Sequence, residues 1–132
     1  MEFRMTKDRT NRIIETLAPQ LRKGFTFDPV AFTHYSGSGY AVSITDNRSK
    51  DRQTALESGL KCWEWYSEGK ALSSAMYPVE RYYLGGWQDL KTGEHCVDVT
   101  IVILNKWRAI KTARENNQSA IYSFETGETI SV

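Results

Sequence analysis

The stretch from 95 to 104, HCVDVTIVIL, limits the possible folds more than any other part of the chain. Ten residues that lack Pro and Gly and are rich in β-branched side chains are typical of a long, mostly buried strand. We therefore expect an interior strand with both faces covered by protein. Alternation places one strongly apolar set of side chains toward packed helices, namely His95, Val97, Val99, Ile101 and Ile103.

The segments on either side of this strand extend the same prediction. An aromatic strand is expected near 82–87, and residues 89–94 have the composition of a reverse turn with a positive φ at Gly93. Asn105 is a plausible N-cap for a helix that reaches 116 or 117. Further strands are expected at 120–124 and 129–132. The strand–helix–strand order predicts that the strands at 95–104 and 120–124 run parallel.

Two further helices are expected in the first half of the chain. Residues 1–24 are basic, and apolar residues at helical spacing predict an amphipathic helix ending near Pro19. A second helix is expected from 51 to 68, where Gly59 is unfavourable unless another part of the chain packs closely against it. Short strands are expected at 25–27 and 40–45.

Length and composition set the fold class. With 132 residues and 40% hydrophobic residues, the chain is predicted to form a single α+β domain spanning 1–132. The expected architecture is a mixed sheet of about five or six strands. Two main helices and the N-terminal helix pack on it.

The charge and the cysteines exclude several classes of protein. A net charge of +1 argues against an acidic mimic of DNA and against a strongly basic nucleic-acid coat protein. No apolar run reaches the roughly 18 residues that a membrane span needs, so no membrane association is predicted. Cys62 and Cys96 are expected to be free thiols in a reducing compartment, and the predicted location is the cytoplasm.

Few residues suggest catalysis, and no catalytic residue, metal site or cofactor is predicted. Asp98 is the exception, because a carboxylate inside an apolar strand needs a partner. Arg81, Tyr83, Thr100 and the backbone at 85–86 are its expected partners. The favoured interpretation is a structural hydrogen-bond centre. The alternative is a small enzyme with a pocket at Gly85, Gly86, Trp87 and Asp98.

Nucleic-acid binding is a second alternative. On the helix after Asn105, the residues Trp107, Lys111 and Arg114 share one face, which combines an aromatic ring with two cations. Arg9 and Arg12 in the basic N-terminal helix are expected to add to this surface. A solvated amphipathic helix explains the same pattern.

The last third of the chain resembles small uncharacterised proteins of bacteriophages and other mobile elements. In those proteins a Gly-Gly-Trp strand, a Thr-Gly turn, an Asp-Val strand and a Gln-Ala-Ile strand occur in the same order. The matching segments here are 83–89, 92–93, 97–99 and 117–122. The resemblance implies an α+β fold and a mobile-element origin, and it implies no activity.

The leading functional hypothesis is therefore a small non-enzymatic interaction protein of phage or mobile-element origin. It is expected to bind a host or phage macromolecule, most plausibly a protein, and to regulate or inhibit it; an anti-defence inhibitor fits this description. Aromatic residues make up 12% of the chain, and Trp and Tyr dominate interface hot spots. The expected anchors are Trp65, Tyr82, Trp87 and Trp107.

Overall fold

The computed structural model describes residues 4–70, 79 and 81–132. Its helices are α1 (Lys7–Leu17), followed by a short 3-10 turn at Ala18–Gln20, α2 (Arg52–Ser67) and α3 (Lys106–Glu115). All three begin where a side chain caps the first turn: the side-chain oxygens of Thr6, Asp51 and Asn105 accept backbone N–H groups. The three expected helices are confirmed. The sequence also predicts a short turn of helix at 70–77, before Pro78, and all of it except Lys70 lies outside the described residues.

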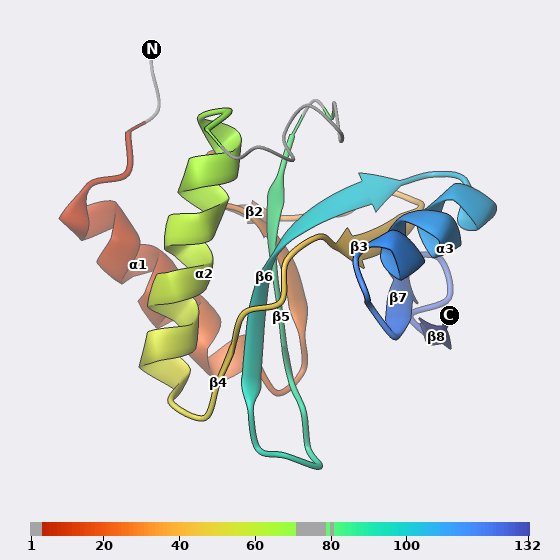
Figure 1. Ribbon diagram of the computed structural model, residues 1–132. Helices are drawn as coiled ribbons and strands as arrows, with labels where there is room; N and C mark the ends of the chain where they lie inside the picture. The colour runs from red at the N-terminus through yellow and green to blue at the C-terminus, as the bar shows by residue number, and fades with distance from the viewer. Residues whose placement is uncertain (1–3, 71–78, 80) are drawn as a thin grey trace.

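The strands form one sheet of eight among the described residues (Figure 1). They are β1 (Phe25–Asp28), β2 (Thr33–His34), β3 (Tyr40–Ser43), β4 (Arg48–Ser49), β5 (Tyr83–Gln88), β6 (His95–Ile103), β7 (Ala120–Ser123) and β8 (Thr129–Ser131). The order is β2-β1-β5-β6-β3-β7-β8, and β4 also pairs with β6. The α+β class is confirmed, but the count of five or six strands is too low.

Every strand pairing in the sheet is antiparallel, so the expectation of a mixed sheet is wrong. β6 and β7 do run parallel to each other, as the strand–helix–strand order predicts. They do not pair, because β3 lies between them and is antiparallel to both. The strand that separates them comes from a distant, earlier part of the chain.

β6 is the interior strand that the sequence predicts. β5 pairs with it along one side, and β3 and β4 pair with it along the other. Its residues 96–101 are all buried. The absence of Pro and Gly from this run leaves every N–H available for the two neighbouring strands.

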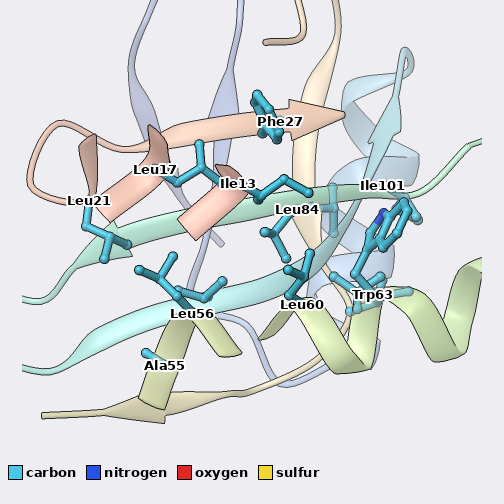
Figure 2. Packing of buried hydrophobic residues seen from close by; sticks show 14 of the residues in the cluster. Ile13, Leu17, Leu21, Phe27, Ala55, Leu56, Leu60, Trp63, Leu84 and Ile101 are labelled. Atoms are coloured by element: carbon cyan, nitrogen blue, oxygen red, sulfur yellow. The ribbon is translucent and has the colours of Figure 1, made fainter. Parts of the chain in front are cut away.

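One face of the sheet carries the helices (Figure 2). α2 lies against β6 at Gly59, where an added Cβ would be 2.7 Å from the carbonyl oxygen of Val97. α3 presents the small residues Ala109 and Ala113, which belong to the same buried cluster as Val42 of β3. Small residues at both contacts let the helices approach the sheet closely. α1 completes the layer with Ile13, Ile14 and Leu17.

None of the helices in the described part of the chain is both long enough and apolar enough to cross a bilayer.

Candidate functional site

The face of the sheet opposite the helices is here called the open face. Along β5, alternation places Tyr83, Gly85 and Trp87 on this face, while Leu84 and Gly86 point toward the helices. None of the described helices covers the open face. The β6 side chains on this face, Cys96, Asp98 and Thr100, are nevertheless buried, so exposed groups on the face come from the other strands and loops.

Four aromatic rings contact one another in a row across the part of the open face near the start of β5, here called the upper open face. The ring of Tyr35 meets Tyr83 edge-on at 5.3 Å between centroids and lies 4.6 Å from Phe124. Tyr122 then meets Phe124 edge-on at 5.4 Å. These rings come from β5, from the segment after β2 and from the β7 region, so the fold brings together residues far apart in the sequence.

A cavity of about 520 Å³ opens beside these rings. The described residues that line it are Tyr35, Val79, Arg81, Tyr83, Val102 and Leu104; the cavity is open to solvent, and polar atoms form the larger share of its exposed lining. Its volume is large enough for a small ligand or a partner's side chain.

Two highly exposed apolar side chains follow β6 in the sequence, and one of them lines the cavity. Leu104 is 71% exposed and lines the cavity, and Trp107, in the first turn of α3, is 75% exposed. Burying two such side chains would be favourable by roughly 2 kcal/mol each. They are the strongest candidates for contact with another molecule.

Cations follow Trp107 along α3. Lys111 and Arg114 are exposed, and the helical spacing places them on the same outward side as Trp107. Lys106 and Arg108 add charge at the start of the helix. None of these four cations forms an ion pair with another residue in the described part of the chain. Their positive potential is therefore not neutralised locally.

The other expected anchors do not join this surface. Trp65 is exposed on α2, where the Nζ atom of Lys70 lies 5.6 Å from its ring. Tyr82 is half-buried, and its ring packs edge-on against Tyr66 of α2. Its carbonyl oxygen accepts the indole N–H of Trp63 at 2.9 Å. Tyr82 therefore lies within the helix–sheet contact.

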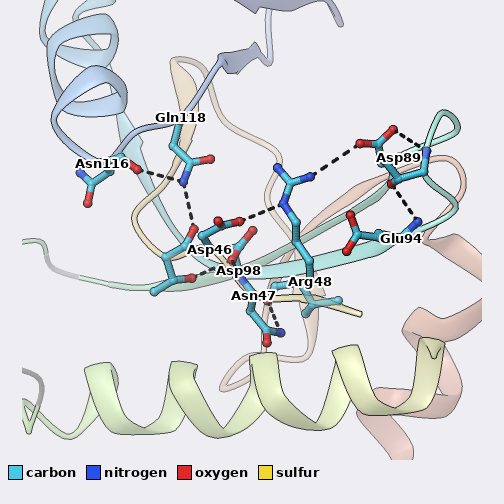
Figure 3. Close-up of polar contacts among 11 residues, drawn as sticks. Asp46, Asn47, Arg48, Asp89, Glu94, Asp98, Asn116 and Gln118 are labelled. Atoms are coloured by element: carbon cyan, nitrogen blue, oxygen red, sulfur yellow. Dashed lines mark hydrogen bonds and ion pairs between the residues drawn. The ribbon is translucent and has the colours of Figure 1, made fainter. Parts of the chain in front are cut away.

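Trp87 lies on the open face but at the opposite end of β5 from Tyr83. The guanidinium of Arg48 lies 5.8 Å from its ring, and the same group contacts Asp46 at 2.9 Å and Asp89 at 3.6 Å. Figure 3 shows Arg48 between these two carboxylates. Trp87 is thus part of a local charged cluster, separated from the cavity by Gly85.

The two basic patches expected to act together are far apart. Figure 1 places α1 and α3 at opposite ends of the sheet. On α1, the guanidinium of Arg12 lies over the ring of Phe32 at 5.1 Å, and Arg9 donates to the carbonyl oxygen of Arg4 at 2.7 Å. Arg9 and Arg12 therefore do not extend the surface formed by Trp107, Lys111 and Arg114.

Asp98 is held by the segment between β3 and β4 (Figure 3). Its Oδ1 accepts the hydroxyl of Thr45 at 2.8 Å and the backbone N–H of Asn47 at 2.7 Å. The register between this segment and β6 shifts by one residue here, which is a β-bulge. The carboxylate fills the place where regular pairing is interrupted.

The hydrogen bonds extend outward from this bulge. The side-chain amide of Asn47 donates to the carbonyl oxygens of Ala55 in α2 and Val97 in β6. Gln118, from the loop before β7, donates to the carbonyl oxygen of Thr45 at 3.0 Å. The contacts seen at Asp98 are thus those of a structural centre that ties helices, strands and a loop together.

Two of the expected side-chain partners of Asp98, Arg81 and Thr100, do not contact its carboxylate. Arg81 instead contacts the buried carboxylate of Asp28. Thr100 donates to the backbone carbonyl oxygen of Asp98 at 3.3 Å, not to its carboxylate. The sequence could not reveal the correct partners, because Thr45 and Asn47 are about fifty residues away and reach Asp98 only through the bulge.

Burial has a measurable consequence for Asp98. Loss of water around the carboxylate raises its pKa to about 6, and the nearby charge of Asp46 acts in the same direction. The hydrogen bonds from Asn47 and Thr45, together with the charge of Arg48, oppose this shift. The group is therefore ionised at neutral pH and titrates in the mildly acidic range.

The glycines suggested for an enzyme pocket are occupied by packing. A Cβ on Gly86 would meet the side chains of Phe25 and Leu21, and one on Gly85 would meet the hydroxyl of Thr100. Neither the cavity above nor a second one of about 250 Å³ between α1 and α2 is lined by Gly85, Gly86 or Asp98. These close approaches explain why glycine occurs at both positions.

The remaining candidates for chemistry are the two cysteines and any cluster of metal-binding side chains. Both cysteines are free, and burial raises the pKa of the Cys96 thiol to about 11 and also raises the pKa of the Cys62 thiol. A thiol with a raised pKa is a poor nucleophile at neutral pH. The described residues contain no group of three or more His, Cys, Asp or Glu side chains placed to hold a metal ion.

Sequence reasoning missed most of the residues around the cavity. Tyr83 carried a signal, because it shares a face with Gly85 and Trp87 by simple alternation. Tyr35 and Phe124 carried none, because each follows a strand and reaches the open face through a loop. Comparison with protein-family models, with curated proteins and with solved structures finds no match, so the geometry of this face is the basis for inferring function.

Proposed function

We propose that this protein is a non-enzymatic binding protein that docks a protein partner on the upper open face and the adjoining start of α3. The observation that supports this most is the exposure of two large apolar side chains: Leu104, which lines the cavity of about 520 Å³, and Trp107, which follows it in the first turn of α3. Exposed apolar groups of this size beside a recess are characteristic of interaction surfaces.

The charge on α3 indicates which partner fits. Four exposed cations lie on α3 with Trp107: Lys106, Arg108, Lys111 and Arg114. None of them forms an ion pair in the described part of the chain. Complementary charge accelerates association and favours one partner over another. We therefore propose an acidic protein surface that offers carboxylates around an apolar contact. A phage or mobile-element origin, with inhibition of a host protein as the outcome, remains part of this proposal.

The test compares two tryptophans that are both exposed but lie on different helices. With the partner recovered from the native host by chemical cross-linking, its affinity is measured for the wild type, Trp107→Ala and Trp65→Ala. Truncation of an interface hot spot costs at least about 2 kcal/mol, so Trp107→Ala should weaken binding by about thirtyfold or more. Trp65→Ala should leave it unchanged. Equal affinities for the wild type and Trp107→Ala would exclude this surface.

Nucleic-acid binding is the second candidate, and one observation favours it. Trp107 is free to stack on a base, and the two cations on its side of α3 follow within about 11 Å along the axis, at 1.5 Å per residue. Binding of a labelled oligothymidylate, measured from 50 to 200 mM salt, separates the candidates. The nucleic-acid function predicts binding that weakens steeply with salt and is lost in a Lys111→Gln, Arg114→Gln double variant. An Arg9→Gln, Arg12→Gln double variant is the matched control.

A further inference from the structure

The cavity beside the aromatic rings has the size of a small-ligand site. Its volume of about 520 Å³ lies inside the range of roughly 300–1,000 Å³ that is usual for small-ligand sites. Val79, Val102 and Leu104 supply aliphatic surface, and two tyrosine rings supply aromatic surface. This combination suits a flat apolar group.

The aromatic wall is fixed before any ligand arrives. Tyr35 donates its hydroxyl to the carbonyl oxygen of Ser38 at 2.7 Å and its backbone N–H to the carbonyl oxygen of Thr26 at 2.9 Å. Its ring is held between those of Tyr83 and Phe124. A wall that needs no rearrangement saves the ordering cost that binding otherwise requires.

Arg81 supplies the only charge among the described lining residues. Its Nη1 atom contacts Oδ2 of Asp28, a carboxylate that is only 3% exposed. Oδ1 of Asp28 is already used, because it accepts the backbone N–H groups of Val30 and Ala31. The ion pair holds the arginine in place, while its side chain remains about half exposed and its guanidinium has further N–H donors.

From these three features we infer that the cavity binds an aromatic group that carries a carboxylate. The ring lies against Tyr35 and Tyr83, and the carboxylate accepts hydrogen bonds from the exposed N–H groups of Arg81, whose planar fork matches a carboxylate. The same chemistry occurs in a free aromatic acid and in the last residue of a peptide that ends in Phe. The inference does not depend on the proposed protein partner.

The experiment uses two matched pairs of probes. The first pair is 3-phenylpropanoate and its neutral amide, and the second is the peptide Ala-Ala-Ala-Phe with a free or an amidated C-terminus. Each is titrated into the ¹⁵N-labelled full chain and followed by two-dimensional NMR. Amides near the cavity, such as those of Tyr35 and Val102, should shift on addition of a carboxylate probe. The neutral probe of each pair should bind about tenfold more weakly or not at all.

Variants locate the site. Leu104→Asp places a negative charge at the mouth of the cavity and should weaken carboxylate binding by about tenfold or more. Leu90→Asp is the control, because Leu90 is 74% exposed, nearly the same as Leu104, but lies in the β5–β6 turn. Val102→Phe should fill the cavity and abolish binding of all probes. Arg81→Lys keeps the charge opposite Asp28 and should weaken binding about threefold to tenfold through loss of the planar fork.

The outcomes are distinct. Shifts with both carboxylate probes, or with one alone, support the inference, and the probe that binds identifies a free acid or a chain end as the source. Equal binding of an acid and its amide, shifts located away from the cavity, or the absence of shifts with every probe would overturn it. Partner binding that persists in Val102→Phe while probe binding is lost would separate this site from the proposed docking function.

Discussion

Asp98 is a carboxylate that the fold removes almost completely from water. Its carboxylate is only 5% exposed, yet it connects β6 to the bulge between β3 and β4. Sequence inspection identified it as the acidic residue most in need of explanation, because it interrupts an apolar strand. The hydrogen bonds observed around it match the favoured structural interpretation.

The raised pKa of Asp98 makes stability depend on pH in a specific direction. The pKa is about 6 in the folded protein and near 3.8 in the unfolded chain, so between these values the folded state binds more protons. The contribution of this group is therefore fully present below about pH 4 and is lost as pH rises through 6, by up to about 3 kcal/mol. Urea unfolding from pH 4 to pH 8 measures this change.

The Asp98→Asn variant isolates the effect. Asparagine keeps an oxygen that accepts from Thr45 and Asn47 but cannot ionise, so the free energy of unfolding of the variant should rise relative to the wild type between pH 4 and pH 7. Asp46 and Arg48 are retained in both proteins, so the two differ only at position 98. A difference that stays constant over this range would contradict the raised pKa.

At the scale of elements, the contact between α2 and β6 shows how a poor helix residue becomes necessary. Gly59 lies in the middle of α2, where glycine costs about 1 kcal/mol relative to alanine. The close approach to Val97 leaves no space for a Cβ. A glycine at this helical position predicts a close contact with another part of the chain, and the packing confirms it.

Gly59→Ala should therefore destabilise the protein despite its gain in helix propensity. The added methyl group forces α2 away from Val97, at an expected net cost of about 1 to 3 kcal/mol in the free energy of unfolding. Ser58→Ala is the matched control, because Ser58 is exposed on the same helix and its replacement should change stability by less than about 0.5 kcal/mol. Chemical denaturation of both variants gives the comparison. An unchanged or raised stability in Gly59→Ala would show that the contact can relax.

The long elements could be predicted from the sequence, and the shortest could not. The helices α1, α2 and α3 and the strand β6 each carry many residues with one consistent periodicity, so local preference and tertiary packing agree. β2 and β4 contain two residues each and exist only because a neighbouring strand supplies hydrogen bonds. The assumption of a mixed sheet failed for a related reason: the insertion of β3 between β6 and β7 leaves no local trace.

At the scale of the whole molecule, the candidate site depends on which face the helices cover. Exposed Trp107 and its cations could be read from one helix, since they need only helical spacing. The cavity could not, because Tyr35, Tyr83 and Leu104 meet only after distant strands pair. Arg9 and Arg12 illustrate the opposite error, in which a shared charge suggested one surface and the fold separates its parts.

Hydrogen exchange should show the sheet's order from centre to edge. β6 is bonded on both sides and should contain the slowest amides, while β2 and β8 should exchange faster. Just after β8, the backbone N–H of Val132 donates to the carbonyl oxygen of Ser119, the residue before β7, at 2.9 Å. By alternation the N–H of Ile130 also points toward β7, whereas those of Thr129 and Ser131 point away. Native-state exchange followed by NMR should find Ile130 protected and Thr129 and Ser131 unprotected. Slow exchange at the latter two would reveal that the edge is covered.

The position of β3 has a consequence for synthesis of the chain. Strands made early, β1 and β3, find their main partners in β5, β6 and β7, which leave the ribosome later. Among the described residues of the first half of the chain, the two-residue pairing of β1 with β2 is the only strand pairing made within that half. The apolar strands of the first half therefore stay unpaired and exposed during translation, so folding occurs near the end of synthesis. Until β7 has left the ribosome, the nascent protein is accessible to chaperones and proteases.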